Sequence, residues 1–231
     1  MMKPALLAAA LLSGSAHLAT AAVISWQTPS NITGASDVTL QGTYYGSWAP
    51  YNANAPSTPV NGVSFQGFSD LPSLNSAFDD GGGYWGPSTA DANYNELLKY
   101  GAFVYSSESR GFSWGGMTPG HTYLVQLWIS DPRNINSSRS AVISSGAGDL
   151  SAVLNYPADG SGPGQFIIGT FVAAANGSQS ILIDPSQNGD PNGGSAQINL
   201  VQVRDLGVIP EPSCMALAGL GALGLLRQRR K

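Results

Sequence analysis

Few side chains in this sequence have the types and spacing that catalysis requires. Between the two apolar chain ends there is one histidine, His121, and there is no cysteine, because Cys214 lies close to the C-terminus. A protein zinc site needs several His, Cys or carboxylate ligands, and the G-x-S-x-G turn that presents a nucleophilic serine is absent. His121 is therefore interpreted as a turn residue, and neither a zinc site nor a Ser/His/Asp triad is expected.

Paired carboxylates are the second chemistry to consider, because glycoside hydrolysis uses two acids at a defined separation. Asp79 and Asp80 are adjacent and are followed by three glycines, so they are interpreted as solvating a flexible loop or hinge. Glu96 and Glu108 form an alternative pair whose separation in space the sequence does not fix. We therefore expect a protein that is not an enzyme.

One short segment has oxygen-bearing side chains at the spacing of a calcium loop. Asn188, Asp190 and Asn192 occupy the first, third and fifth positions, a glycine occupies the sixth, and Asp184 precedes them. Ca²⁺ prefers such oxygen ligands, but the position of the closing glutamate is occupied by Asn199. A plain Asn/Asp/Gly turn is favoured, with structural calcium as the weaker alternative and no other cofactor or metal expected.

A charged group follows the most apolar predicted strand. Asp131 and Arg133 flank a proline, and Arg139 is close by. They are interpreted as an ion pair that braces a loop, which contributes little if it is exposed. The alternative is a set of ligand-contacting groups at a rim.

Aromatic side chains in predicted loops are candidates for stacking on sugar rings, because they are large, rigid and amphipathic. Four such residues are Trp48, Tyr51, Tyr84 and Trp85. Loop aromatics also close the ends of β-sandwiches, and this is the favoured interpretation. The ligand therefore stays unknown at this stage.

The composition between the chain ends limits the class of partner. Residues 22–209 carry five Lys and Arg against thirteen Asp and Glu, a net charge of −8. This excess of acid disfavours nucleic acid and anionic membrane surfaces as partners. With no disulfide available, stability must come from core burial, for which one domain of this size is sufficient.

Short apolar and β-branched runs separated by turn residues predict an all-β fold. Strands are expected at residues 23–28, 38–45, 60–68, 101–107, 111–114, 123–131, 139–144, 166–173, 180–184 and 196–205. One short helix is expected at residues 91–99. About ten strands with so little helix favour an antiparallel β-sandwich, of the jelly-roll type, with no internal repeat.

The clearest predicted strand is at residues 123–131. Apolar side chains occupy both parities, so we expect a central strand that is covered on both faces. The preceding Pro119 and Gly120 suit a type II turn. Tyr123, two residues after His121, resembles the tyrosine that fixes a corner in sandwich domains.

The N-terminus has the pattern of a secretory signal peptide. A basic residue, Lys3, is followed by an apolar stretch and then by Ala19-Thr20-Ala21. Cleavage by signal peptidase is expected after Ala21, so residues 1–21 form the signal peptide. The mature chain then begins at Ala22.

The C-terminus has three parts in a fixed order. Pro210-Glu211-Pro212 is followed by an uncharged run of 14 residues, 213–226, and then by basic residues. This run is shorter than the roughly 17–25 residues of an ordinary membrane crossing, yet in water it would be an exposed apolar patch. The basic end would be retained in the cytoplasm; it consists of Arg227, Arg229, Arg230 and Lys231.

This order of proline-flanked glutamate, short apolar segment and arginine-rich end resembles the PEP-CTERM sorting tail of Gram-negative bacteria. The resemblance implies a transmembrane sorting helix that is recognised by exosortase, a membrane protease of transpeptidase type, and processed near Pro210-Glu211-Pro212. Cys214 departs from the pattern and is interpreted as a small apolar filler.

The region before the tail also resembles secreted domains that precede PEP-CTERM tails in planctomycetes and verrucomicrobia. The resemblance implies a galactose-binding-like jelly roll and assigns no function to it. The blocks that carry it are Asn31-Ile32-Thr33-Gly34 with Asp37, Val60-Asn61-Gly62-Val63, Tyr123, Val125-Gln126 and Trp128 with Asp131 and Arg133, residues 164–171, and Gln197-Ile198-Asn199.

Three regions are therefore predicted: a signal peptide at 1–21, a β-sandwich at 22–207 and a sorting tail at 208–231. The expected protein is non-enzymatic and exported. Its precursor passes through the inner membrane, and its mature form is at the envelope surface or in the extracellular matrix. The alternative is a carbohydrate-binding module that acts on exopolysaccharide.

Overall fold

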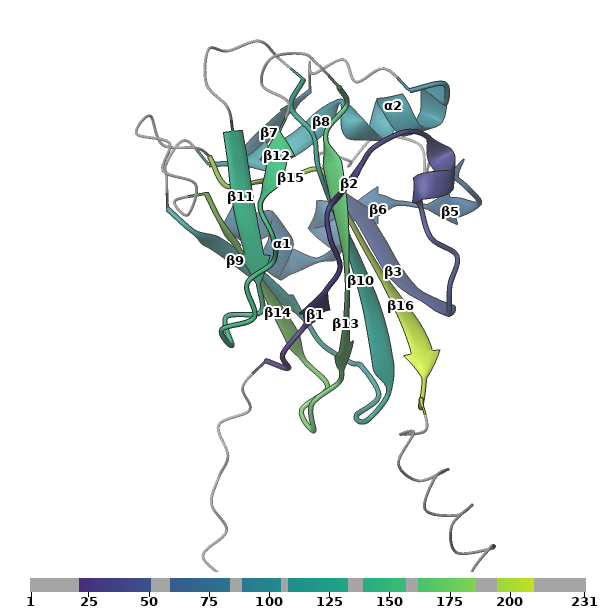
Figure 1. The fold of residues 1–231 in the computed structure, drawn as a ribbon, viewed down its shortest axis with the longest axis vertical. Coiled ribbons are helices and arrows are strands. Elements are labelled where there is room, and N and C mark those ends of the chain that lie inside the picture. Colours follow the sequence, from purple (N-terminus) through teal and green to yellow (C-terminus); the bar gives the residue numbers. More distant parts are fainter. Residues whose placement is uncertain are drawn as a thin grey trace, which may run out of the picture.

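The computed structural model describes residues 21–50, 59–83, 89–104, 108–132, 139–156, 162–185 and 195–209. Two sheets pack face to face (Figure 1). The larger sheet has the order β1 (Ser25–Trp26), β13 (Gln165–Val172), β10 (Thr122–Ile129), β16 (Leu200–Gly207), β3 (Thr43–Ala49) and β6 (Gln66–Gly67), and β2 (Ser30–Asn31) also pairs with β13. The smaller sheet has the order β12 (Leu154–Tyr156), β11 (Arg139–Ser144), β14 (Gln179–Asp184) and β9 (Arg110–Trp114).

Smaller elements complete the fold. A three-stranded sheet contains β15 (Gln197–Ile198), β8 (Tyr100–Phe103) and β7 (Asp79–Gly83), and a hairpin contains β4 (Pro59–Val60) and β5 (Val63–Ser64). The helices are α1 (Pro72–Ala77) and α2 (Ala92–Leu98), with 3-10 turns η1 (Ala35–Asp37) and η2 (Phe68–Asp70). The described chain is mostly sheet with little helix, which confirms the all-β prediction.

The main core lies between the two sheets. Strand β10 contributes Tyr123, Val125, Leu127 and Ile129 to it, and all four side chains are at most 1% exposed. The smaller sheet contributes side chains such as Ile143 from the opposite layer. We call the side of the larger sheet that faces this core the inner face.

The other side of the larger sheet, the outer face, has a second apolar cluster. Trp128 from β10 meets Leu97 and Leu98 of α2 there, and all three are buried. Helix α2 begins where the carboxylate of Asp91 accepts a hydrogen bond from the Tyr94 backbone N–H at 2.8 Å. The predicted helix and the strand covered on both faces are therefore confirmed.

The turn before β10 has the predicted geometry. Gly120 has φ +79°, a value that glycine adopts without a steric penalty, and the His121 N–H donates to the Thr118 carbonyl at 3.2 Å. The Tyr123 hydroxyl accepts a hydrogen bond from the Thr118 N–H at 2.9 Å. The tyrosine thus fixes the corner from which β10 starts.

Two predicted elements were wrong, and one helix was not predicted. Residues 60–68 do not form one strand, because Asn61 and Gly62, with φ of 48° and 75°, turn the chain into the β4–β5 hairpin. The predicted loop at Asp79 and Asp80 is strand β7, whose backbone pairs with β8. Helix α1 was missed; it has proline in its first turn, as many helices do.

The two ends of the described chain lie at the same end of the sandwich, which we call the base (Figure 1). Strand β1 starts there, and β16 runs towards it and ends at Gly207. Helix α2 and strand β8 lie at the opposite end. The chain therefore enters and leaves the described fold at the same end.

Candidate functional site

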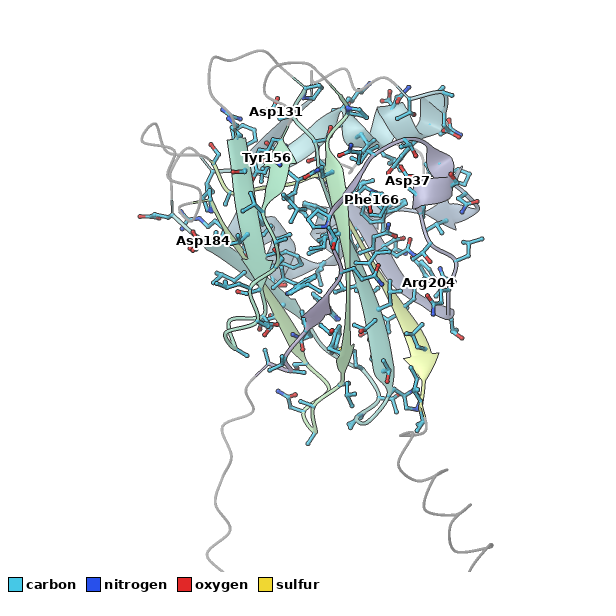
Figure 2. All side chains as sticks on the ribbon, in the orientation of Figure 1. Asp37, Asp131, Tyr156, Phe166, Asp184 and Arg204 are labelled. Atoms are coloured by element: carbon cyan, nitrogen blue, oxygen red, sulfur yellow. The ribbon has the colours of Figure 1, made fainter. Side chains whose placement is uncertain are left out.

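A buried ion pair lies at the end of the sandwich opposite the base (Figure 2). Asp131 follows β10, Arg139 begins β11, and Arg139 Nη1 donates to Asp131 Oδ2 at 2.7 Å. The Asp131 side chain is 0% exposed and that of Arg139 is 21% exposed. The loop-bracing interpretation therefore fits the Asp131–Arg139 pair; Arg133 lies outside the described residues.

Asn199 forms hydrogen bonds with several polar groups in the region beside this pair. Its Nδ2 donates to the carbonyls of Leu98 and Tyr100 at 3.0 and 2.9 Å, and its Oδ1 accepts from the Ser130 N–H at 2.7 Å and from Gln197 Nε2 at 3.0 Å. All four hydrogen-bonding positions of the amide are thus used. The predicted strand 196–205 is consequently interrupted at Asn199, and its two parts are β15 and β16.

Two oxygens of this polar cluster are buried without a hydrogen-bond partner: Ser130 Oγ and Gln197 Oε1. Tyr156 closes the cluster by donating from its hydroxyl to the Ser195 carbonyl at 3.2 Å. Burial raises the pKa of the Tyr156 hydroxyl, so this group remains a neutral donor. The guanidinium of Arg139 beside these groups opposes a bound cation, and the cluster is best understood as a structural brace.

The single histidine of the folded region is paired with a carboxylate near the base. His121 Nδ1 lies 3.0 Å from Asp205 Oδ2, and its ring stacks on that of Tyr123. Burial raises the pKa of Asp205, but hydrogen bonds from His121 and from the Gly207 N–H lower it, and the net shift is downward. His121 therefore lies at the start of a strand, as predicted, but holds an acid and is not simply solvated.

The two acids whose pairing the sequence left open, Glu96 and Glu108, are not brought together. Glu96 lies on α2, over the outer face, and pairs with Lys99 at 2.5 Å. Glu108 precedes β9, in the sheet that packs on the inner face, and pairs with Arg110 at 2.9 Å. Each acid is thus bound to a neighbouring cation on a different layer of the fold.

Most residues of the predicted aromatic and calcium sites lie outside the described residues. Trp48 is 7% exposed and packs in the main core, so it cannot stack on a sugar. Tyr51, Tyr84 and Trp85 lie outside the described residues, as do Asn188, Asp190 and Asn192. Within the described ranges, no group of three His, Cys, Asp or Glu side chains could hold a metal ion.

Sequence reasoning missed a polar ladder on the outer face. Gln126, Gln202 and Arg204, from the two central strands, bind the backbone of residues 37–42 as it crosses the sheet (Figure 2 labels Asp37 and Arg204). Gln126 Nε2 donates to the Asp37 carbonyl at 2.7 Å, and Gln202 Nε2 donates to the Thr39 carbonyl at 2.7 Å. The available indication was three long polar side chains on one parity of strands that are otherwise apolar.

The C-terminal residues match a known sorting signal. Residues 208–231 match the family model of the PEP-CTERM protein-sorting motif. We refer to the residues that match this motif, 208–231, as the PEP-CTERM tail. The match starts at Val208, directly after β16 ends at Gly207. Among the described residues, no helix has the length and apolar character needed to cross a membrane; Pro210-Glu211-Pro212 and the rest of the PEP-CTERM tail lie outside them.

The folded region resembles solved extracellular domains of Arabidopsis thaliana. The ANX2 ectodomain superposes with a TM-score of 0.51 at 11% identity, over 69% of this chain and 49% of that one. The ANXUR1 extracellular domain gives 0.50 at 10% identity, over 77% and 53%. This chain thus spans about half the length of those proteins, and the likeness concerns the fold alone. No curated protein matches the sequence.

Proposed function

We propose that the protein is an exported, non-enzymatic β-sandwich that its PEP-CTERM tail delivers to the cell envelope surface or extracellular matrix. The observation that carries the proposal is the motif match at residues 208–231, which begins directly after the last strand. An exosortase-type protease would process the tail near Pro210-Glu211-Pro212. The inner membrane is then a temporary location of the precursor.

The placement of the chain ends supports this proposal. The predicted signal peptide precedes β1 and the tail follows β16, and both strands reach the base (Figure 1). Because the signal peptide and the tail are both attached at the base, the folded region can form on the outer side of the membrane. Neither segment then needs to pass through the folded region. The opposite end, with α2 and the Asp131–Arg139 pair, then points away from the bilayer.

Two variants test the sorting role in cells that carry an exosortase. Deletion of residues 210–231 should release a soluble product whose circular dichroism spectrum is unchanged. Replacement of Pro210, Glu211 and Pro212 by alanine should leave the full-length precursor in the inner membrane. If both variants are located and processed like the unaltered protein, the tail is not a sorting signal.

The absence of catalysis is part of the proposal, supported by the placement of the candidate acids. His121 is held by Asp205, and Glu96 and Glu108 lie on different layers. We expect no turnover when the purified full chain is incubated with a broad panel of polysaccharides. Release of sugars by the protein, and not by a Glu96→Gln variant, would overturn this part.

The carbohydrate-binding alternative is weaker than the sequence alone indicated. Of its four candidate aromatics, the one within the described chain, Trp48, is buried in the main core. A glycan array that includes bacterial exopolysaccharides separates the two proposals. Saturable binding that survives Trp48→Phe but is lost on Trp85→Ala would favour the binding module.

A further inference from the structure

The first residue after the predicted signal peptide is clamped by a buried amide. The Ala22 backbone N–H donates to Gln179 Oε1 at 3.0 Å, and Gln179 Nε2 donates to the Ala22 carbonyl at 2.9 Å and to the Ser180 carbonyl at 3.1 Å. Gln179 begins β14 and is 1% exposed. Chain termini are usually poorly ordered unless they are tied down, and here Gln179 ties Ala22 to the smaller sheet.

The residues that follow are held equally closely. The Ile24 N–H donates to Asp149 Oδ2 at 2.6 Å, and Trp26 Nε1 donates to the Asp149 carbonyl at 2.7 Å. Ile24 is 2% exposed and lies in the main core, and Ala22 packs against the same core. The other edge of β1 pairs with β13 of the larger sheet. Residues 22–26 therefore join the two sheets along one open side of the sandwich.

The partner strand leaves room for this segment. At Gly169 of β13, an added Cβ would collide with the Ile24 side chain and would lie 2.6 Å from Trp26 Cε3. Any larger residue at position 169 would push β1 away from the sheet. The close seating of residues 22–26 is thus built into both neighbouring elements.

The clamp begins at the residue where the sequence predicts the mature chain to begin. We propose that Gln179 is the docking site for the mature amino terminus, with the new α-ammonium group of Ala22 donating to Gln179 Oε1. This inference rests on the signal-peptide part of the proposed function. Signal peptidase hydrolyses the Ala21–Ala22 peptide bond with one water, leaving a carboxylate on Ala21 and an amine on Ala22 that takes up a proton at neutral pH.

Cleavage changes the chemistry of this contact without moving it. Before cleavage Ala22 offers one neutral N–H; afterwards it offers a charged group with three N–H bonds. Hydrogen bonds with a charged donor are shorter and roughly twice as strong as neutral ones. Since Ala22 is only half-buried, water can solvate the remaining protons. Removal of the signal peptide therefore strengthens the contact by which residues 22–26 join the two sheets.

The first measurement is N-terminal sequencing of the full chain, exported with its own signal peptide and purified from the membrane fraction in mild detergent. The expected first residue is Ala22. A different first residue would overturn the inference, because no ammonium group would then be present at Ala22. That outcome concerns signal cleavage and leaves the role of the PEP-CTERM tail to the localisation experiment.

The second measurement uses a glycine inserted between Ala21 and Ala22, which keeps Ala19-Thr20-Ala21 for the peptidase. Cleavage then leaves Ala22 with a peptide N–H in place of the ammonium. We expect Tm, measured by tryptophan fluorescence, to fall by about 2–6 °C, the scale on which one or two strong contacts register in a domain of this size. An unchanged Tm would overturn the docking of the ammonium group.

Substitution of Gln179 identifies the acceptor. Gln179→Leu should lower Tm with the native start, and the inserted glycine should then cause little further loss, because both changes remove one contact. Gln179→Glu should be better tolerated with the native start, where it faces an ammonium group, than with the inserted glycine. Gln27→Leu, on an exposed residue beside the same strand, is the matched control and should leave Tm unchanged. Fully additive losses would overturn the assignment of Gln179.

Discussion

The two faces of the larger sheet are both covered, but by different chemistry. The inner face is apolar along β10, from Tyr123 to Ile129, and packs against a second sheet. The outer face combines an apolar cluster around Trp128 with the polar ladder, whose side chains bind a passing backbone. A regular sheet satisfies its own backbone groups, whereas an irregular segment must find partners elsewhere. The difference shows how one strand can seal a sheet on one side and anchor a loop on the other.

The largest effects are expected from substitutions that test whether the two faces contribute equally to the stability of the fold. Leu127→Ala on the inner face and Trp128→Ala on the outer face should each lower the free energy of unfolding by about 3–5 kcal/mol, since each leaves a buried cavity. Urea unfolding followed by circular dichroism measures both. Val172→Ala, at an exposed position of β13, is the control. A loss below about 1 kcal/mol for Trp128→Ala would show that the outer layer is separable from the fold.

An intermediate effect is expected from the polar ladder. Gln126 accepts from the Thr39 N–H at 3.1 Å and donates to the Asp37 carbonyl. Gln126→Leu should lower the free energy of unfolding by about 1–3 kcal/mol, because it leaves the partly buried Thr39 N–H and Asp37 carbonyl without this partner. Hydrogen exchange should speed up at the Thr39 amide while β10 stays protected. The control is Gln66→Leu on an exposed residue of β6; equal exchange at Thr39 in both variants would contradict the ladder.

The smallest effect concerns the His121–Asp205 pair at the base. The pKa of Asp205 is lower in the folded state than in the unfolded chain, so Asp205 contributes stability above its unfolded pKa of about 3.9. This contribution is lost as the pH falls through the folded pKa. The pair is partly exposed, which limits it to under about 1 kcal/mol. Asp205→Asn should therefore flatten the dependence of unfolding free energy on pH between neutrality and acid. If the curves of the variant and of the unaltered protein run parallel over this pH range, the stabilising role of the pair is contradicted.

The sequence predicts best those strands whose apolar side chains are buried in the core. β10 and β11 were placed closely because apolar and β-branched runs specify a buried strand. Residues 38–42 read as strand by composition, yet they cross the outer face without joining the sheet, because Gln126, Gln202 and Arg204 bind their backbone. Such long-range side-chain contacts leave no local pattern.

The candidate site shows the same division. An ion pair among Asp131, Arg133 and Arg139 was predicted from proximity in the chain, but the sequence did not indicate which arginine binds Asp131. The complete burial of Asp131 could not be predicted either, because it depends on Asn199 and its neighbours, which are distant in sequence. The turn at Asn61 and Gly62 was predictable, since Asn-Gly favours this hairpin. The clamp on Ala22 could not be predicted, because nothing near Gln179 marks it as a partner for a residue 157 positions earlier.

Strand β16 lies between β10 and β3 and runs directly into the PEP-CTERM tail. A force on that tail acts along a strand that is hydrogen-bonded on both sides, so the bonds are loaded together in shear and do not open one after another. A pull on the carboxyl end is thus resisted by both neighbouring strands, β10 and β3, at once. By contrast, a pull at the amino end acts first on the hydrogen bonds between Ala22 and Gln179, and then on the two-residue edge strand β1.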